Sequence, residues 1–237
     1  MSVLNGKTCL ITGGSGGLGE ALAREFGRAG CRVLLSGSNR EKLQTVTQKL
    51  SHSIRLAGSC LADLTLDREI ENLIKWVQET TGTLDILINN AGVFPVGGLT
   101  TMDVADIDAC LNVNMRAPLL LCRAFAAGMR SMGWGRIVNI ASSSAYAGFA
   151  NTAAYCASKH GLLGLSRALD DELRPQGIRV IALSPGSIQT PMGRNVRGQT
   201  FDTFLNPAEI AAMCAHVAAL DGNMVVKELR LDRMVIA

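Results

Sequence analysis

Short apolar runs rich in β-branched residues alternate along this 237-residue chain with longer amphipathic segments. The apolar runs at 86–88 and 137–138 offer no polar face to solvent, so helices must cover both sides of a parallel sheet. We therefore expect an α/β fold, with a doubly wound parallel sheet in a single domain that spans 1–237. The periodicity predicts strands near 7–11, 32–36, 54–60, 84–88, 136–140, 178–183 and 225–230, and helices near 18–29, 40–50, 67–80, 103–131, 153–173 and 207–219.

The composition narrows the classes of function. A net charge of +3 is too small and too dispersed to indicate a nucleic-acid partner, and no run of about 18 apolar residues could span a membrane. The first residues lack the pattern of a secretory signal, and the seven cysteines form no Cys-x-x-Cys, which predicts a cytoplasmic protein. Three histidines that do not cluster predict no metal site.

A glycine-rich turn lies between the first predicted strand and the first predicted helix. Its backbone N–H groups and the positive helix end can bind a dinucleotide pyrophosphate. Asp63 closes the third strand, where it could accept a hydrogen bond from an adenine amino group or instead cap a turn. The segment after the fourth strand lies where a ribose and nicotinamide would pass. The candidate residues of the turn and of this segment are Gly13, Ser15, Gly17, Leu18, Gly19, Asn90, Ala91 and Gly92.

Tyr155 and Lys159 are four residues apart on a predicted helix. This spacing places their Cβ atoms about 5–6 Å apart on one face, so the ammonium can lower the pKa of the phenol from its usual value of roughly 10. A tyrosine tuned in this way can exchange a proton near neutral pH. Taken alone, the pair could also be a chance arrangement on a helix surface.

In combination, these motifs resemble the short-chain dehydrogenase/reductase family, which has a Rossmann-like fold, over residues of about 5–220. The resemblance implies that Tyr155 protonates a substrate carbonyl, that Lys159 binds the nicotinamide ribose, and that Ser142, thirteen residues before Tyr155, donates a hydrogen bond to the substrate oxygen. It also implies a kink at Asn114 that holds a water near Lys159. Further cofactor contacts are implied at Leu64, Pro185, Gly186, Ile188 and Thr190.

The end of the second strand indicates the preferred nicotinamide cofactor. NAD-preferring sites usually carry an acid there, which holds the ribose 2′-hydroxyl. Here Gly37 is followed by Ser38, Asn39 and Arg40, which would offer donors to a 2′-phosphate. NADP(H) is therefore favoured, with NAD(H) as the alternative, and Arg40 could instead be a solvated residue at the start of the next helix.

The leading functional hypothesis is an NADP(H)-dependent carbonyl reductase that interconverts a small ketone or aldehyde with an alcohol. A 3-oxoacyl-carrier-protein reductase is the alternative, for which Arg130 and Arg174 could contact the carrier. A regulatory protein that binds the cofactor without turnover is a third hypothesis, which the intact catalytic set argues against. An apolar acyl or ring substrate is suggested by four candidate pocket residues: Phe94, Tyr146, Phe149 and Met192.

The predicted helices 103–131 and 153–173 carry more apolar side chains than one sheet face can cover. In the family resembled, these helices pair across two-fold axes. We therefore expect a homo-oligomer, a tetramer or else a dimer. The side chains concerned are Leu119, Leu120, Leu121, Phe125, Leu162, Leu163, Leu165 and Leu169.

Overall fold

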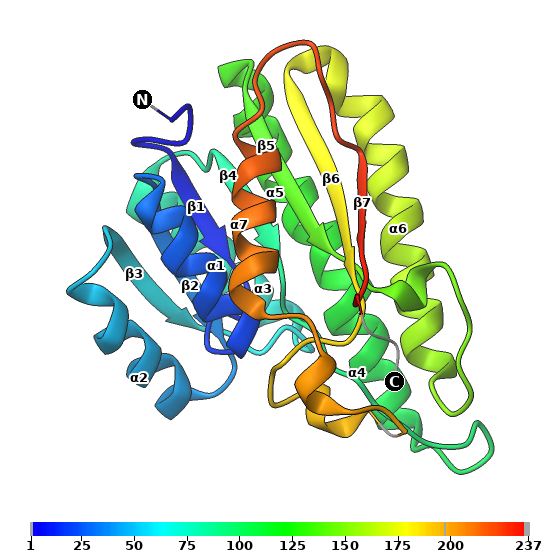
Figure 1. The fold of residues 1–237 in the computed structure, drawn as a ribbon. Helices are drawn as coiled ribbons and strands as arrows, with labels where there is room; N and C mark the ends of the chain where they lie inside the picture. Colours follow the sequence, from blue (N-terminus) through cyan, green and yellow to red (C-terminus); the bar gives the residue numbers. More distant parts are fainter. Residues whose placement is uncertain (1, 197, 235–237) are drawn as a thin grey trace.

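The computed structural model describes residues 2–196 and 198–234, which form one parallel sheet flanked by helices (Figure 1). The strand order is β3-β2-β1-β4-β5-β6-β7, so the direction of winding reverses between β1 and β4, which is where doubly wound sheets bind their ligands. The predicted fold class is confirmed. The strands are β1 (Thr8–Ile11), β2 (Arg32–Gly37), β3 (Leu56–Leu61), β4 (Ile86–Asn89), β5 (Gly135–Ile140), β6 (Ile178–Pro185) and β7 (Glu228–Leu231).

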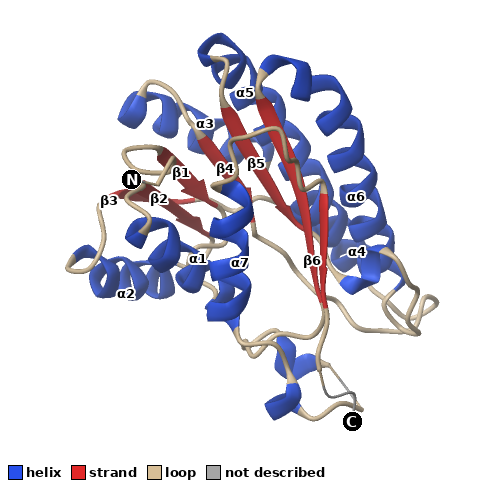
Figure 2. Ribbon diagram, turned by 45° about the horizontal axis from the view of Figure 1, so that its top comes forward, coloured by secondary structure: helices blue, strands red, loops and turns tan. Residues whose placement is uncertain are grey.

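Helices cover both faces of the sheet, as Figure 2 shows. Helices α1, α2 and α7 pack on one face, and α3, α5 and α6 pack on the other. Within the described residues, no helix is long and apolar enough to cross a membrane. The helices are α1 (Gly17–Arg28), α2 (Arg40–Ser51), α3 (Asp67–Thr81), α4 (Val104–Leu111), α5 (Ala117–Met132), α6 (Ala153–Leu173) and α7 (Pro207–Ala218).

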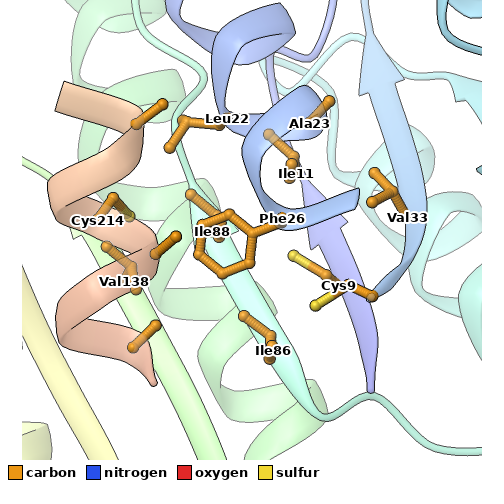
Figure 3. Packing of buried hydrophobic residues seen from close by; sticks show 14 of the residues in the cluster. Cys9, Ile11, Leu22, Ala23, Phe26, Val33, Ile86, Ile88, Val138 and Cys214 are labelled. Atoms are coloured by element: carbon orange, nitrogen blue, oxygen red, sulfur yellow. The ribbon is translucent and has the colours of Figure 1, made fainter. Parts of the chain in front are cut away.

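Phe26 of α1 occupies the centre of the core on the first face (Figure 3). It is fully buried, as are Leu22 one turn earlier and Ile88 of β4. Cys214 lies in the same cluster and brings α7 against α1. Complete burial of such side chains stabilises by roughly 1.5–3 kcal/mol each, and it holds α1 against the sheet.

The helix predicted over 103–131, with a kink implied at Asn114, is divided into α4 and α5 by a π-helical turn, Asn112–Arg116. The side chain of Asn114 explains the break, because it bonds to backbone outside the helix. Its Oδ1 accepts from the N–H of Val93 at 2.9 Å, and its Nδ2 donates to the carbonyl of Val93 at 3.0 Å. The extra residue in a π-turn is a common way to turn a functional side chain inward.

The last strand is shorter than the predicted run of 225–230, because it begins only at Glu228. Upstream of it, the carbonyls of Gly222 and Met224 accept hydrogen bonds from the guanidinium of Arg179, at 2.5 and 2.9 Å. Carbonyls that are satisfied by a side chain in this way do not need a partner strand. The N–H of Ala182 in β6 donates to the carbonyl of Lys227 at 2.8 Å, and ladder pairing starts at Ala182 and Glu228.

Candidate active site

One cavity of about 1000 Å³ runs along the carboxyl ends of the strands. It extends from the start of α2, past the glycine-rich turn, to the first turns of α6. Most of the predicted site residues line it: Gly13, Ser15, Gly17, Leu18, Gly19, Ser38, Asn39, Asp63, Leu64, Asn90, Ala91, Gly92, Ser142, Tyr155, Lys159, Pro185, Gly186, Ile188 and Thr190. Of the residues predicted in the site, Arg40 and Asn114 are outside this lining.

The glycine-rich turn is held against the end of β4. Gly13 has a φ of 63°, and a Cβ atom there would lie 2.8 Å from the Cα of Ala91, so only glycine fits. Thr12 Oγ1 accepts from the N–H groups of Asn90 and Ala91 at 3.0 and 3.1 Å. The side chain of Asn90 donates back to the carbonyls of Thr12 and Gly13 at 2.9 and 3.1 Å, so this amide holds the turn in place.

Helix α1 begins directly after this turn without a side-chain cap. The N–H groups of its first turn and the positive end of its dipole are therefore available to an anion in the cavity. A Cβ atom at Gly17 would lie 3.1 Å from Cγ2 of Thr190, so the segment after β6 passes close over the start of the helix. The backbone thus fits a pyrophosphate enclosed between α1 and the 187–193 segment.

Asp63 takes part in a turn, which is the alternative that the sequence left open. Its Oδ1 accepts from the N–H and from the hydroxyl of Thr65, at 2.9 and 2.8 Å. Both bonds use the same oxygen, so the other carboxylate oxygen remains available to an adenine amino group. Leu64 lies buried beside it in the cavity wall.

A basic residue lines the cavity at the start of α2, but it is Lys42 and not Arg40, for which the sequence also left open a solvated position. Arg40 is the first residue of α2 and does not line the cavity, whereas Lys42 does. Asn39 caps the helix, because its Oδ1 accepts from the N–H of Lys42 at 2.9 Å. The third residue of a helix lies where its side chain can reach back to the cap, while the first does not, and this rule could have identified Lys42.

Tyr155, Lys159 and Ser142 meet at the other end of the cavity. Lys159 Nζ is buried, donates to the carbonyl of Ile140 at 2.7 Å, and lies 5.7 Å from the centre of the Tyr155 ring. Ser142 follows β5 and lines the cavity together with Tyr155, and its Oγ accepts from the N–H of Ser144 at 3.1 Å. The close spacing of a phenol, a hydroxyl and an ammonium suits proton transfer to an oxygen atom.

Asn114 is linked through Ser158 to the backbone of Tyr155. Its Nδ2 donates to Ser158 Oγ at 3.0 Å, and Ser158 Oγ donates to the carbonyl of Tyr155 at 2.7 Å. The Oδ1 atom of Asn114 would be 3.3 Å from a Cβ at Gly92, in the cavity wall. The π-turn is thereby tied to the helix that carries the tyrosine and the lysine.

The expected lowering of the Tyr155 pKa is wrong for the protein alone. Burial raises the pKa of Tyr155 to about 12, and the nearby Ser142 hydroxyl opposes this rise only in part. Burial also lowers the pKa of Lys159 to about 8. The ammonium is directed at the carbonyl of Ile140 rather than at the phenol, so removal from water dominates both groups. Tyr155 consequently holds its proton at neutral pH.

The depressed pKa of Lys159 predicts a dependence of stability on pH. Below about pH 8 Lys159 is protonated in both the folded and the unfolded state, so the folded state bears the full cost of the buried charge. Between about pH 8 and 10.5 Lys159 stays protonated only in the unfolded state, so this residue should contribute a rise of about 3 kcal/mol to the free energy of unfolding, at about 1.4 kcal/mol per unit of pKa. Buried thiols with raised pKa values lower stability above about pH 9 in both proteins, so the test is the difference between the wild type and Lys159→Met in denaturant titrations, which should grow by that amount across the window. Parallel curves would contradict the prediction.

The segment after β6 closes the nicotinamide end. Ile188 forms a parallel bridge with Leu205, and the N–H of Gly186 donates to the carbonyl of Leu231 at 2.8 Å. Thr190 Oγ1 accepts from the N–H of Gly193 at 3.2 Å. The segment is thus held from two sides by the chain that follows it.

Three of the four residues predicted to line an apolar pocket do so, namely Phe94, Phe149 and Met192. Tyr146 does not, because its hydroxyl donates to Glu228 Oε2 at 2.7 Å on the β7 side. Among the residues that the structure describes, no three histidine, cysteine or acidic side chains are grouped to hold a metal ion.

A family model for short chain dehydrogenases matches residues 7–200. The chain belongs to the short-chain dehydrogenase family. The 3-oxoacyl-acyl-carrier-protein reductase FabG of Rickettsia bellii is 37% identical over 189 residues, which cover 80% of this chain and 76% of that protein. The family predicted from the sequence, with its oxidoreductase class, is confirmed.

Two solved structures share the fold along nearly the whole chain. A metagenomic short-chain oxidoreductase in complex with NADP is 34% identical, with a TM-score of 0.85, and the match covers 98% of this chain and 99% of that one. A variant of actinorhodin polyketide ketoreductase with NADPH is 28% identical, with a TM-score of 0.87, over 98% of this chain and 97% of that one.

Proposed function

We propose that this protein is an NADP(H)-dependent carbonyl reductase. One observation carries the proposal: a single cavity joins the glycine-rich turn to Ser142, Tyr155 and Lys159. When bound, the nicotinamide supplies a hydride to a carbonyl carbon or accepts one from an alcohol.

The chain itself supplies the proton and the oxygen site. Tyr155 holds its proton at neutral pH and releases it to the carbonyl oxygen as that atom becomes an alkoxide. Ser142 lines the cavity together with Tyr155, so its hydroxyl can donate to the same oxygen and stabilise the developing charge. Lys159 keeps a positive charge beside them up to about pH 8 and orients the ribose side of the site.

Turnover with a panel of small ketones tests the function. Purified protein should oxidise NADPH in the presence of uncharged ketones, monitored by the loss of absorbance of the reduced nicotinamide. Tight NADPH binding without turnover on any ketone would favour the regulatory alternative instead.

The choice of NADP(H) rests on the end of β2 and the start of α2. Gly37 leaves no carboxylate to repel a 2′-phosphate, and Ser38 and Lys42 line the cavity beside it. The solved structures with NADP and NADPH are of relatives with the same fold and support this choice.

Lys42→Ala should raise the dissociation constant for NADPH about tenfold, equivalent to about 1.4 kcal/mol, because a charge-assisted contact to the 2′-phosphate is lost. Binding of NADH should change less than about twofold. Titration by fluorescence of the reduced nicotinamide measures both constants. Arg40→Ala is the matched control, two residues away and outside the cavity. Equal effects of the two variants would show that only the general charge of α2 matters.

A 3-oxoacyl-carrier-protein reductase is the second candidate, supported by the Rickettsia relative. The carrier is acidic in enzymes of that kind, and the basic residues available for it are few. Arg174 is already paired with Asp170 and Asp171, at 2.6 and 2.8 Å, while Arg130 is exposed. A higher kcat/KM on a carrier-bound 3-oxoacyl thioester than on the same acyl group without carrier would establish this alternative.

We propose a homotetramer, or else a dimer, that works in the cytoplasm. Leu119 and Met132 of α5 remain 46% and 38% exposed, although Leu121 and Phe125 are buried in the monomer. All seven cysteines are free thiols, as a reducing compartment requires. Light scattering at micromolar concentration should give a mass of two or four times the single-chain 25.1 kDa. A mass of one chain would contradict the assembly.

A further inference from the structure

A second cavity, of about 450 Å³, adjoins the catalytic cavity. The two share four wall residues in the segment after β4, which are Val93, Phe94, Val96 and Gly97. The Phe94 ring meets the Tyr155 ring edge-on, with centres 4.7 Å apart and planes at 73°. The second cavity therefore lies beside the catalytic cavity, and one aromatic ring separates it from the proposed proton donor.

The rest of the lining gives this cavity its chemical character. Apolar residues and polar groups share its lining surface about equally, and its volume falls in the range of ordinary small-molecule sites. Asp103, Asp106 and the hydroxyl-bearing Thr101 complete it, and no lysine or arginine lines it within the described chain. Asp103 is held in place because its Oδ1 accepts from the N–H of Ala105 at 3.0 Å as the cap of α4. The apolar lining residues are Val93, Phe94, Pro95, Val96, Met102 and Ala109.

We propose that the second cavity is a distal substrate subsite, which takes an apolar group ending in a hydrogen-bond donor or a positive charge, such as an amine. The proposal rests on the carbonyl reductase function, since it places the reacting carbonyl at Tyr155 and the far end of the same molecule beyond Phe94 and Val96. A carboxylate at that end would face Asp103 and Asp106 and be repelled.

Three ketones of equal length test the subsite, with a terminal ammonium, a terminal hydroxyl or a terminal carboxylate. Both kcat/KM and the calorimetric dissociation constant with the protein–NADPH complex should follow that order, with about a tenfold difference between ammonium and carboxylate. Asp106→Asn should reduce this ratio at least about threefold. Asp108→Asn removes an equal charge from the same helix but outside the cavity, so it should leave the ratio nearly unchanged.

A cavity-filling variant separates the subsite from general electrostatics. Ala109→Phe should lower the affinity for the long ammonium ketone at least about fivefold, while a ketone truncated before the wall keeps its wild-type kcat/KM. Equal effects of Asp106→Asn and Asp108→Asn, or a filled cavity that still binds the long ketone normally, would overturn the subsite. Absent turnover on all ketones would refute the proposed function, whereas the calorimetric binding order would still decide the subsite.

Discussion

Tyr155→Phe should lower kcat for ketone reduction at least about 100-fold, the lower scale for loss of a positioned general acid. The variant removes one hydroxyl, whose raised pKa keeps it protonated at neutral pH. The ring itself stays, and with it the edge-on contact with Phe94. Steady-state oxidation of NADPH with an uncharged ketone measures the loss.

Two controls keep this result specific. The NADPH dissociation constant should stay within about twofold of wild type, because the Tyr155 hydroxyl faces the substrate oxygen. Ser144→Ala, in the same loop as Ser142, should leave turnover nearly unchanged, since only the backbone N–H of Ser144 bonds to Ser142. Near-wild-type turnover in Tyr155→Phe would remove Tyr155 from the reaction.

Arg136→Leu should lower the free energy of unfolding by about 3 kcal/mol, which is the largest stability effect that we expect from a single side chain here. Arg136 lies on β5 with no exposed surface, and its guanidinium lies at the C-terminal end of α7. It donates to the carbonyls of Ala218 and Leu220 at 3.0 Å each and to Asp221 Oδ1 at 2.5 Å. Leucine would leave these buried carbonyls without donors. Urea unfolding followed by circular dichroism measures the change.

The matched control for this variant is Asp221→Asn. The Asp221 side chain is about half exposed, so water can replace much of its interaction with Arg136. Asp221→Asn should therefore lower the free energy of unfolding by less than about 1 kcal/mol. The Trp134 ring stacks on the Arg136 guanidinium at 4.2 Å, and its fluorescence reports whether the local packing survives. If Arg136→Leu is as stable as Asp221→Asn, the carbonyls of α7 have found other donors.

Local patterns predicted much of this protein because they act over a few residues. A glycine-rich turn between a strand and a helix has little freedom, and the φ of Gly13 and its approach to Ala91 follow from it. The placement of Tyr155 and Lys159 on one face of a helix follows from their spacing alone. The break at Asn114 was predicted as a kink, but its form as a π-turn depends on Val93, which is distant in the sequence.

The errors arose where an orientation or an environment is set by distant residues. Tyr146 has the same apolar ring as the other pocket candidates, but Glu228 of β7 draws its hydroxyl away from the cavity. Arg40 and Lys42 are both basic, and only the cap at Asn39 determines which of them faces the 2′-phosphate end.

The sequence by itself determined the order of strands and helices, the place of the glycine-rich turn and the residues that we propose for proton transfer, because these depend on periodicity and on short spacings. Only the tertiary structure decided the pKa values of Tyr155 and Lys159, since burial by distant parts of the chain outweighs the effect of one on the other. It also created the second cavity behind Phe94, which exists only because the segment after β4 packs against α4.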